Sequence, residues 1–171
     1  VRGFPLLRAM AAGDPRTFEE LLAKLARLAA EFLIEQVKAG AQAVQVFDSW
    51  GGVLSRRDWQ RLVRPHLRDL LHELVRAGVP RILYFQDSAH LLDSVLELPA
   101  DCFSLDWKVD LGAVRQQIGP AKALQGNLDP AVLLAGPETT RTAARELLGR
   151  VPSLGHVFNL GHGIQPGTPL E

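Results

Sequence analysis

The sequence predicts an α/β protein built on a parallel sheet. Five short apolar segments alternate with longer segments in which apolar residues recur about every 3.6 positions. Each short segment runs into glycine and polar residues, which is typical of a strand that ends in a loop. Strands that are apolar on both faces are buried on both faces, and this favours a parallel sheet with helical crossovers.

The first helical pattern begins at Asp14-Pro15, an N-cap followed by a proline in the first turn, and Gly40 ends it. The first strand is expected at residues 43–47, before a glycine-rich turn at residues 48–52. The apolar face predicted for this helix consists of Phe18, Leu21, Leu22, Leu25, Leu28, Ala29, Phe32, Leu33 and Val37.

A second helix is expected to open at Ser55, with Asp58 three residues further on, and to end before Gly78. Pro65 should kink or divide it, because proline removes a backbone donor and crowds the preceding turn. The remaining elements are expected in this order: a strand at 81–85, a short helix at 91–96, a strand at 102–105, a helix at 111–118, a strand at 122–125, a helix at 138–150 and a strand at 156–160.

Two architectures fit this alternation: an open doubly wound sheet and part of a (β/α)8 barrel. No G-x-G-x-x-G motif follows the first strand, and no Walker A loop occurs in the sequence. Nucleotide binding therefore lacks its usual sequence support. The pattern alone leaves both architectures open.

Composition limits the classes of partner. Nineteen basic residues balance nineteen acidic ones, so no basic field indicates a nucleic acid or membrane surface. Cys102 is the single cysteine, which excludes an internal disulfide and suits a reducing compartment. No apolar run approaches the roughly 20 residues that span a bilayer. We therefore expect a cytoplasmic protein with neither a nucleic acid nor a membrane partner.

We expect residues 1–171 to belong to a single domain that is truncated at both ends. The chain opens at Val1 without an initiator methionine, and residues 168–171 (TPLE) have the pattern of a helix start with a capping box.

Unusual residues gather at the five predicted strand ends, where ligands meet both architectures. These segments are 48–50, 86–87, 106–107, 126–129 and 159–163. His162 lies between two glycines at such an end, and we favour a functional role for it. Simpler structural roles are expected elsewhere: Asp110 and Asp129 as helix N-caps, Asp48 and Asp106 as loop caps or partners of arginines, the three tryptophans in packing, His156 as structural, and His66, His72 and His90 as incidental.

Four stretches resemble the uroporphyrinogen decarboxylase family. They are residues 45–55 (QVFDSWGGVLS), 105–107 (LDW), 124–130 (LQGNLDP) and 155–164 (GHVFNLGHGI). The resemblance covers essentially the whole chain. It implies a (β/α)8 barrel, with the five predicted strands as the fourth to eighth.

The resemblance implies decarboxylation of the four acetate side chains of uroporphyrinogen to coproporphyrinogen, without a metal or organic cofactor, by a homodimer. It places two substrate-binding residues in this sequence: Ser49 in the F-D-S-W loop and His162 in N-L-G-H-G. The family's paired arginines, its catalytic aspartate and a tyrosine would all precede Val1. The catalytic residue therefore stays unassigned, and we expect the chain alone to be inactive.

The acidic residues at the strand ends conflict with a substrate that carries eight carboxylates. We expect the preceding arginines to attract the substrate, and several of the aspartates to orient them or to cap helices. The acidic residues in question are Asp48, Asp87, Asp106, Asp110 and Asp129, with Lys108 as one of few nearby cations. The loop at residues 84–88 (YFQDS) also departs from the glycine-containing loop of the family.

Two alternatives remain open. One is a barrel methyltransferase of the same superfamily that acts on corrinoid or thiol carriers; these enzymes hold zinc through a His-x-Cys pair, which has no counterpart around Cys102. The other is a non-catalytic fragment that binds tetrapyrrole.

Overall fold

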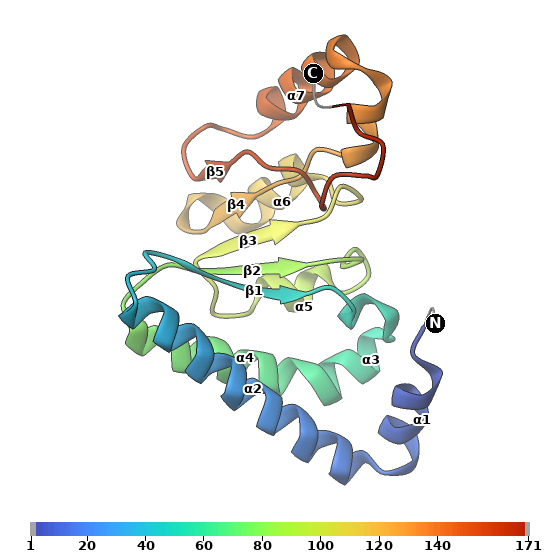
Figure 1. Cartoon of the computed structure of the whole chain (residues 1–171), viewed down its shortest axis with the longest axis vertical. Coiled ribbons are helices and arrows are strands. Elements are labelled where there is room, and N and C mark those ends of the chain that lie inside the picture. The colour runs from blue at the N-terminus through green and yellow to red at the C-terminus, as the bar shows by residue number, and fades with distance from the viewer. Residues whose placement is uncertain (1–2, 170–171) are drawn as a thin grey trace.

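The fold is a single five-stranded parallel sheet with helices between successive strands (Figure 1). The structure is a computed structural model and describes residues 3–169. The strands are β1 (Val44–Asp48), β2 (Arg81–Phe85), β3 (Cys102–Leu105), β4 (Ala123–Gln125) and β5 (His156–Val157).

The strands follow one another in the sheet in chain order, β1-β2-β3-β4-β5. A doubly wound sheet reverses its strand order at a switch point, whereas a (β/α)8 barrel never does. No reversal occurs along these five strands, so the arrangement is that of five consecutive β/α units of a barrel. This confirms the barrel architecture and rejects the open doubly wound sheet.

The longer helices are α1 (Pro5–Gly13), α2 (Pro15–Lys38), α4 (Arg64–Glu73), α6 (Leu111–Ile118) and α7 (Pro137–Arg150). Short helical segments complete the crossovers: η1 (Gly51–Val53), α3 (Arg56–Asp58), η2 (Trp59–Val63), η3 (Leu74–Ala77), α5 (Leu92–Leu96), η4 (Gly119–Ala121) and η5 (Pro130–Ala135). No helix within residues 3–169 has the length and apolar character needed to cross a membrane.

The main hydrophobic core lies between the sheet and its helices. Alternate strand residues such as Leu83, Phe103 and Leu124 point toward the helices and are fully buried. Trp59 and Leu71, from the crossover between β1 and β2, pack into the same core. Helices α2 and α4 lie side by side along β1 (Figure 1). The other strand positions therefore form a second face, which the crossover helices do not cover.

Local sequence signals account for the helix boundaries. Asp14 accepts the backbone N–H of Thr17 at 3.2 Å, and Ser55 accepts that of Asp58 at 3.1 Å, so both predicted N-caps are confirmed. The second helix is divided as predicted: the π-helical turn η2 ends at Val63, and α4 begins immediately before Pro65. Because Pro65 has no N–H to donate to the preceding turn, the regular α-helical ladder cannot run through it.

Three features differ from the sequence-based expectations. Helix α1 was not predicted, and β5 is shorter than residues 156–160, although Leu160 still bridges to Leu128. The apolar face predicted for α2 is only partly buried, because the described elements that pack against α2 cover one side of this face and leave the other side exposed. Leu21, Leu25, Leu28 and Phe32 remain 37% to 65% exposed.

The predicted helix start at residues 168–171 is described only in part. Leu170 and Glu171 lie outside the described residues. Thr168 donates its backbone N–H and its hydroxyl to the carbonyl of Gln165, at 3.1 and 2.7 Å, and thus belongs to a turn.

Candidate functional site

The face of the sheet opposite the crossover helices carries an uncharged layer. Phe47, Tyr84, Ser104 and Gln125 are partners in the strand register and share this face. The side-chain amide of Gln125 donates to the hydroxyl of Ser104 at 3.0 Å and to the amide oxygen of Gln45 at 3.2 Å. Barrel interiors are usually filled with bulky branched residues, so a hydrogen-bonded polar layer here indicates a site that contacts ligand or water.

A hollow of about 450 Å³ opens above this layer. Ser49, one residue beyond β1, and His162, in the loop after β5, both line it. The structure thus brings the two sequence-predicted site residues to one hollow, although they lie at opposite ends of the sheet order. The lining consists of Gln45, Phe47, Ser49, Tyr84, Ser104, Asn159, Leu160, His162, Gly163 and Ile164.

Aromatic and cationic side chains lie next to His162. The ring of Trp107 meets the imidazole edge to face, with centroids 6.2 Å apart and planes at 87°. The ammonium of Lys108 lies 5.3 Å from the centre of the Trp107 ring, and the same ammonium forms an ion pair with Asp87. Trp107, for which the sequence predicted only a packing role, therefore has a specific contact beside the site.

None of the five aspartates at the strand ends lines the hollow. Asp110 accepts the backbone N–H groups of Gly112 and Ala113, and Asp129 accepts that of Ala131, so both predicted helix caps are confirmed. Both carboxylates act within their own chain segment. None of the five carboxylates therefore forms a wall of the hollow, although Asp87 and Asp106 lie close enough to the lining residue Tyr84 to raise its pKa.

Asp48, Asp87 and Asp106 are also used locally. Asp48 accepts the N–H of Gly51 at 2.7 Å, and Asp106 accepts that of Lys108 at 2.8 Å together with that of Asp87. Burial raises the pKa of Asp48, an effect that the backbone N–H groups of the following turn partly offset. Asp87 pairs with Lys108 rather than with an arginine.

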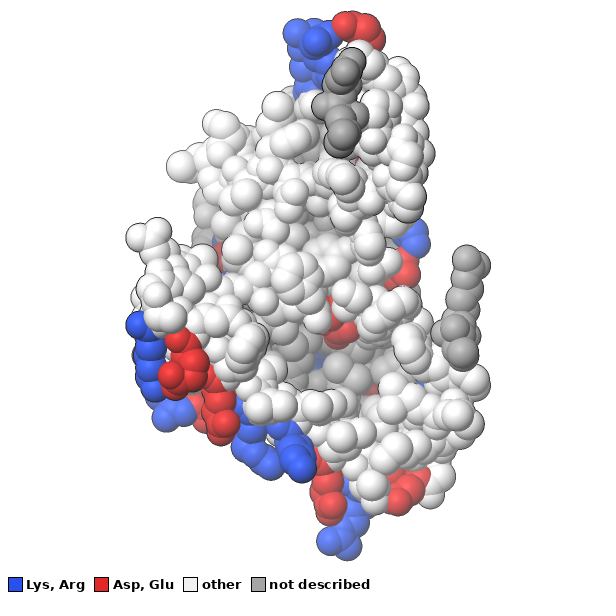
Figure 2. Space-filling view, viewed as in Figure 1, with Lys and Arg blue, Asp and Glu red and all other residues white. Residues whose placement is uncertain are grey.

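The surface drawn in Figure 2 agrees with this distribution of charge. Lysine, arginine, aspartate and glutamate side chains gather along the edge where α2 runs and at the far end near α7. The middle of the face is mostly uncharged, but acidic atoms also show near its centre and at its right edge (Figure 2).

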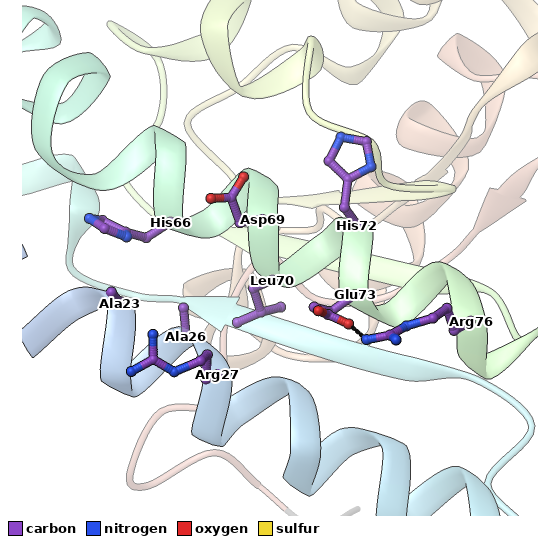
Figure 3. A pocket seen from close by; sticks show the side chains of 9 residues that line it. All are labelled: Ala23, Ala26, Arg27, His66, Asp69, Leu70, His72, Glu73 and Arg76. Atoms are coloured by element: carbon purple, nitrogen blue, oxygen red, sulfur yellow. Dashed lines mark ion pairs between the residues drawn. The ribbon is translucent and has the colours of Figure 1, made fainter. Parts of the chain in front are cut away.

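A second depression, of about 460 Å³, lies between α2 and α4 on the helical side of the sheet (Figure 3). Both signs of charge line it, and Glu73 pairs there with Arg76. His66, in the first turn of α4, and His72, near the end of the same helix, both lie on this groove. Within residues 3–169, no three His, Cys, Asp or Glu side chains lie close enough to hold a metal ion. The groove lies on the helical side of the sheet, away from the strand ends that carry Ser49 and His162.

The other two histidines bind backbone carbonyls. His156 lies 2.8 Å from the carbonyl oxygen of Gly126, which fits the structural role predicted for it, and His90 lies 2.9 Å from that of Leu54.

Sequence reasoning missed Gln45, Tyr84, Ser104 and Gln125 as site residues. The alternation of side chains along a strand contains a usable signal. Phe47 lies two positions before Ser49, and Tyr84 two before Gln86, and the register pairs Phe47 with Tyr84 on one face of the sheet. In strands that are apolar throughout, however, this parity does not say which face opens to the ligand.

Comparison with known proteins adds to this geometry. The family model for uroporphyrinogen decarboxylase (URO-D) matches residues 1–171. Curated proteins named uroporphyrinogen decarboxylase are similar to the chain: 48% identical over 162 residues in Streptomyces coelicolor, 44% over 167 in Nocardia farcinica and 41% over 173 in Coxiella burnetii.

These matches cover 94% to 98% of the chain and 46% to 48% of the relatives, so the chain spans about half their length. The order of the five strands, the hollow at their carboxyl ends and the match along all 171 residues lead to one assignment. The chain belongs to the uroporphyrinogen decarboxylase family.

Proposed function

We propose that the protein that carries this chain decarboxylates the four acetate side chains of uroporphyrinogen to give coproporphyrinogen, in the synthesis of haem and related tetrapyrroles. The observation that carries this proposal is that Ser49 and His162, which resemble two substrate-binding positions of the family, line one hollow. The similar proteins in Streptomyces, Nocardia and Coxiella bear the name of this activity.

The two residues suit the recognition of a carboxylate. The hydroxyl of Ser49 and the imidazole of His162 can each donate a hydrogen bond to an acetate oxygen. The neighbouring polar groups are the uncharged Gln45, Ser104 and Tyr84, and no carboxylate of the described residues lines the hollow. The lining side chains themselves therefore carry no negative charge that would repel a polyanionic tetrapyrrole. The arginines that the family resemblance places before Val1 would supply the attraction.

The chemistry needs positioning more than an electron sink supplied by a cofactor. Protonation of a pyrrole carbon allows the ring to accept the electron pair released when carbon dioxide leaves. The protein must then hold the acetate in a productive orientation and stabilise the charged intermediate. In this proposal Ser49 and His162 hold carboxylates, and no residue of the chain is assigned the main catalytic role. A cytoplasmic homodimer that requires no metal is part of the same proposal.

Anaerobic turnover of uroporphyrinogen tests the proposal. The protein in its natural length, freed of metal by a chelator, should convert uroporphyrinogen to coproporphyrinogen, and a His162→Ala variant should be slower or release partly decarboxylated products. A folded protein that shows no turnover would contradict the proposal. Zinc in stoichiometric amount in the untreated protein, together with methyl transfer to a thiol or corrinoid, would support the methyltransferase alternative instead.

A further inference from the structure

Tyr84 connects β2 to the loop that carries His162. Its side chain is 6% exposed, and its hydroxyl donates a hydrogen bond to the backbone carbonyl of Gly161 at 3.0 Å. In the sheet order, β3 and β4 lie between β2 and β5, after which this loop follows. The bond therefore spans the face of the sheet on which the hollow opens, and Tyr84 itself lines that hollow.

The acceptor is the carbonyl immediately before His162. The carbonyl of Gly161 and the N–H and Cα of His162 belong to one planar peptide unit. A donor that fixes the oxygen of this unit also restricts the plane from which the His162 side chain departs. Tyr84 can thus orient the imidazole without touching it.

Two further contacts hold Gly161 on its other sides. Its N–H donates to the carbonyl of Leu128 at 2.8 Å. A Cβ at this glycine would meet the backbone nitrogen of Trp107 well inside contact distance, so the Gly161 backbone lies directly against the end of β3. Among residues 3–169, the side chain that bonds to Gly161 is that of Tyr84, and it holds the carbonyl side.

The Tyr84 hydroxyl remains a donor over a wide pH range. Burial, with smaller contributions from Asp106 and Asp87, raises the pKa of Tyr84 to about 12. The ring also packs against Phe47, with centroids 5.6 Å apart, which restricts its orientation. Tyr84 is therefore neutral throughout the physiological pH range, and its hydroxyl can donate to the Gly161 carbonyl over that whole range.

We propose that Tyr84 is a positioning residue that sets the orientation of His162 through the Gly161 carbonyl, for the decarboxylation proposed above. The inference rests on that proposed function for its kinetic consequence, while the structural part stands on the hydrogen bond itself. Tyr84 acts through His162 and needs no contact with the reacting carbon.

The test is a Tyr84→Phe variant of the protein in its natural length. Phenylalanine keeps the ring and its packing and removes only the hydroxyl. Loss of one neutral hydrogen bond should lower kcat for uroporphyrinogen about fivefold to tenfold, with a smaller change in KM. The matched control is Thr140→Val, which removes a hydroxyl bonded to the carbonyl of Gly136 at 2.9 Å, remote from the hollow. The control should leave kcat unchanged.

A double-mutant comparison separates positioning from a general structural role. In a His162→Ala background, Tyr84→Phe should cause no further fall in kcat, because the group that Tyr84 positions is gone. An equal fall in both backgrounds would overturn the proposal, as would an unchanged kcat in an otherwise active Tyr84→Phe protein.

Amide hydrogen exchange gives a readout that does not depend on turnover. The Gly161 amide, whose N–H donates to Leu128, should exchange about fivefold to tenfold faster in Tyr84→Phe than in the parent or in Thr140→Val. Faster exchange in a protein that does not decarboxylate uroporphyrinogen would reject the proposed function and keep the positioning role. Unchanged exchange would overturn the positioning role whatever the activity.

Discussion

The carboxylate of Asp106 accepts the backbone N–H of Asp87, so a side chain at the end of β3 fixes the first residues beyond β2. The same carboxylate accepts the N–H of Lys108 at 2.8 Å, and Asp106 has no exposed surface. Backbone donors at two strand ends therefore depend on one buried side chain.

Replacement of Asp106 by alanine should lower the free energy of unfolding by about 2–4 kcal/mol, since it leaves backbone donors unsatisfied. Asp106→Asn should cost less, because its amide oxygen can still accept one of the two N–H groups. Urea unfolding measures both. Asp110→Ala removes only a helix cap, so it is the control and should cost about 1 kcal/mol. An Asp106→Ala variant no less stable than the Asp110→Ala control would contradict the role of Asp106.

Gly161→Ala should destabilise the protein by about 1–3 kcal/mol, because the new methyl group has no room against the Trp107 backbone. Gly163→Ala, two residues further on, is the matched control for stability: a Cβ there meets no atom within 4 Å. Thermal unfolding of the two variants should separate them by several degrees. Equal unfolding temperatures would show that the loop is not pressed against the end of β3.

The Asp101–Arg81 pair should make stability depend on pH in the acid range. Arg81 binds both carboxylate oxygens of Asp101, at 2.8 and 2.9 Å, and this contact lowers the pKa of Asp101 below 3.8. A lowered pKa in the folded state means that the stabilisation is present above pH 3.8 and is lost as the pH falls through the lower, folded-state value.

Asp101→Asn should therefore lower the free energy of unfolding by about 1–2 kcal/mol at pH 7. The expected loss is small because the carboxylate is 42% exposed, and it should become smaller still as the pH falls below 3.8. Urea unfolding across this range checks it. Asp69→Asn removes a more exposed pair with Arg68 and should change stability by less than about 0.5 kcal/mol. A gap between Asp101→Asn and the parent that stays constant down to pH 2.5 would refute the linkage.

Tyr84 should ionise at about pH 12, two units above the ordinary value of 10.0, because its hydroxyl is buried. The difference in absorbance near 295 nm between the parent and Tyr84→Phe should therefore stay flat up to about pH 11. Since the folded state holds the proton more tightly, Tyr84 contributes its full stabilisation below pH 10 and loses it between pH 10 and 12. A phenolate signal with a midpoint near pH 10 in the folded protein would show that the hydroxyl is accessible to water.

Much of the fold could be predicted from the sequence, because the relevant signals are local. Asp14, Ser55 and Pro65 set helix boundaries through contacts within one turn, and the structure reproduces them. Helix α1 begins with Pro5 and packs against the adjacent α2, so its local signal was present and was overlooked. The length of β5 depends on its pairing with β4, which periodicity does not report. The partly exposed face of α2 could not be predicted either, because an apolar stripe indicates that a helix surface packs but not how much of that surface its neighbours cover.

The candidate site was predictable in part. Ser49 and His162 could be placed at strand ends, and the structure brings them to one hollow. Asp48 is also at a strand end, but it is the register partner of Phe85, on the helix-facing side of the sheet. Tyr84 was overlooked because its contact with Gly161 joins residues 77 positions apart.

The measurement that tests the central claim most directly is steady-state turnover of uroporphyrinogen by Ser49→Ala, His162→Ala and the double variant of the natural-length protein. Each single change should lower kcat/KM about 10-fold to 100-fold, the range for one lost hydrogen bond to a charged carboxylate, and release partly decarboxylated products. Because both residues line one hollow, the double variant should lose less than the product of the two single losses. Folded single variants with the kcat/KM and products of the parent would contradict the assignment of this hollow as the substrate site.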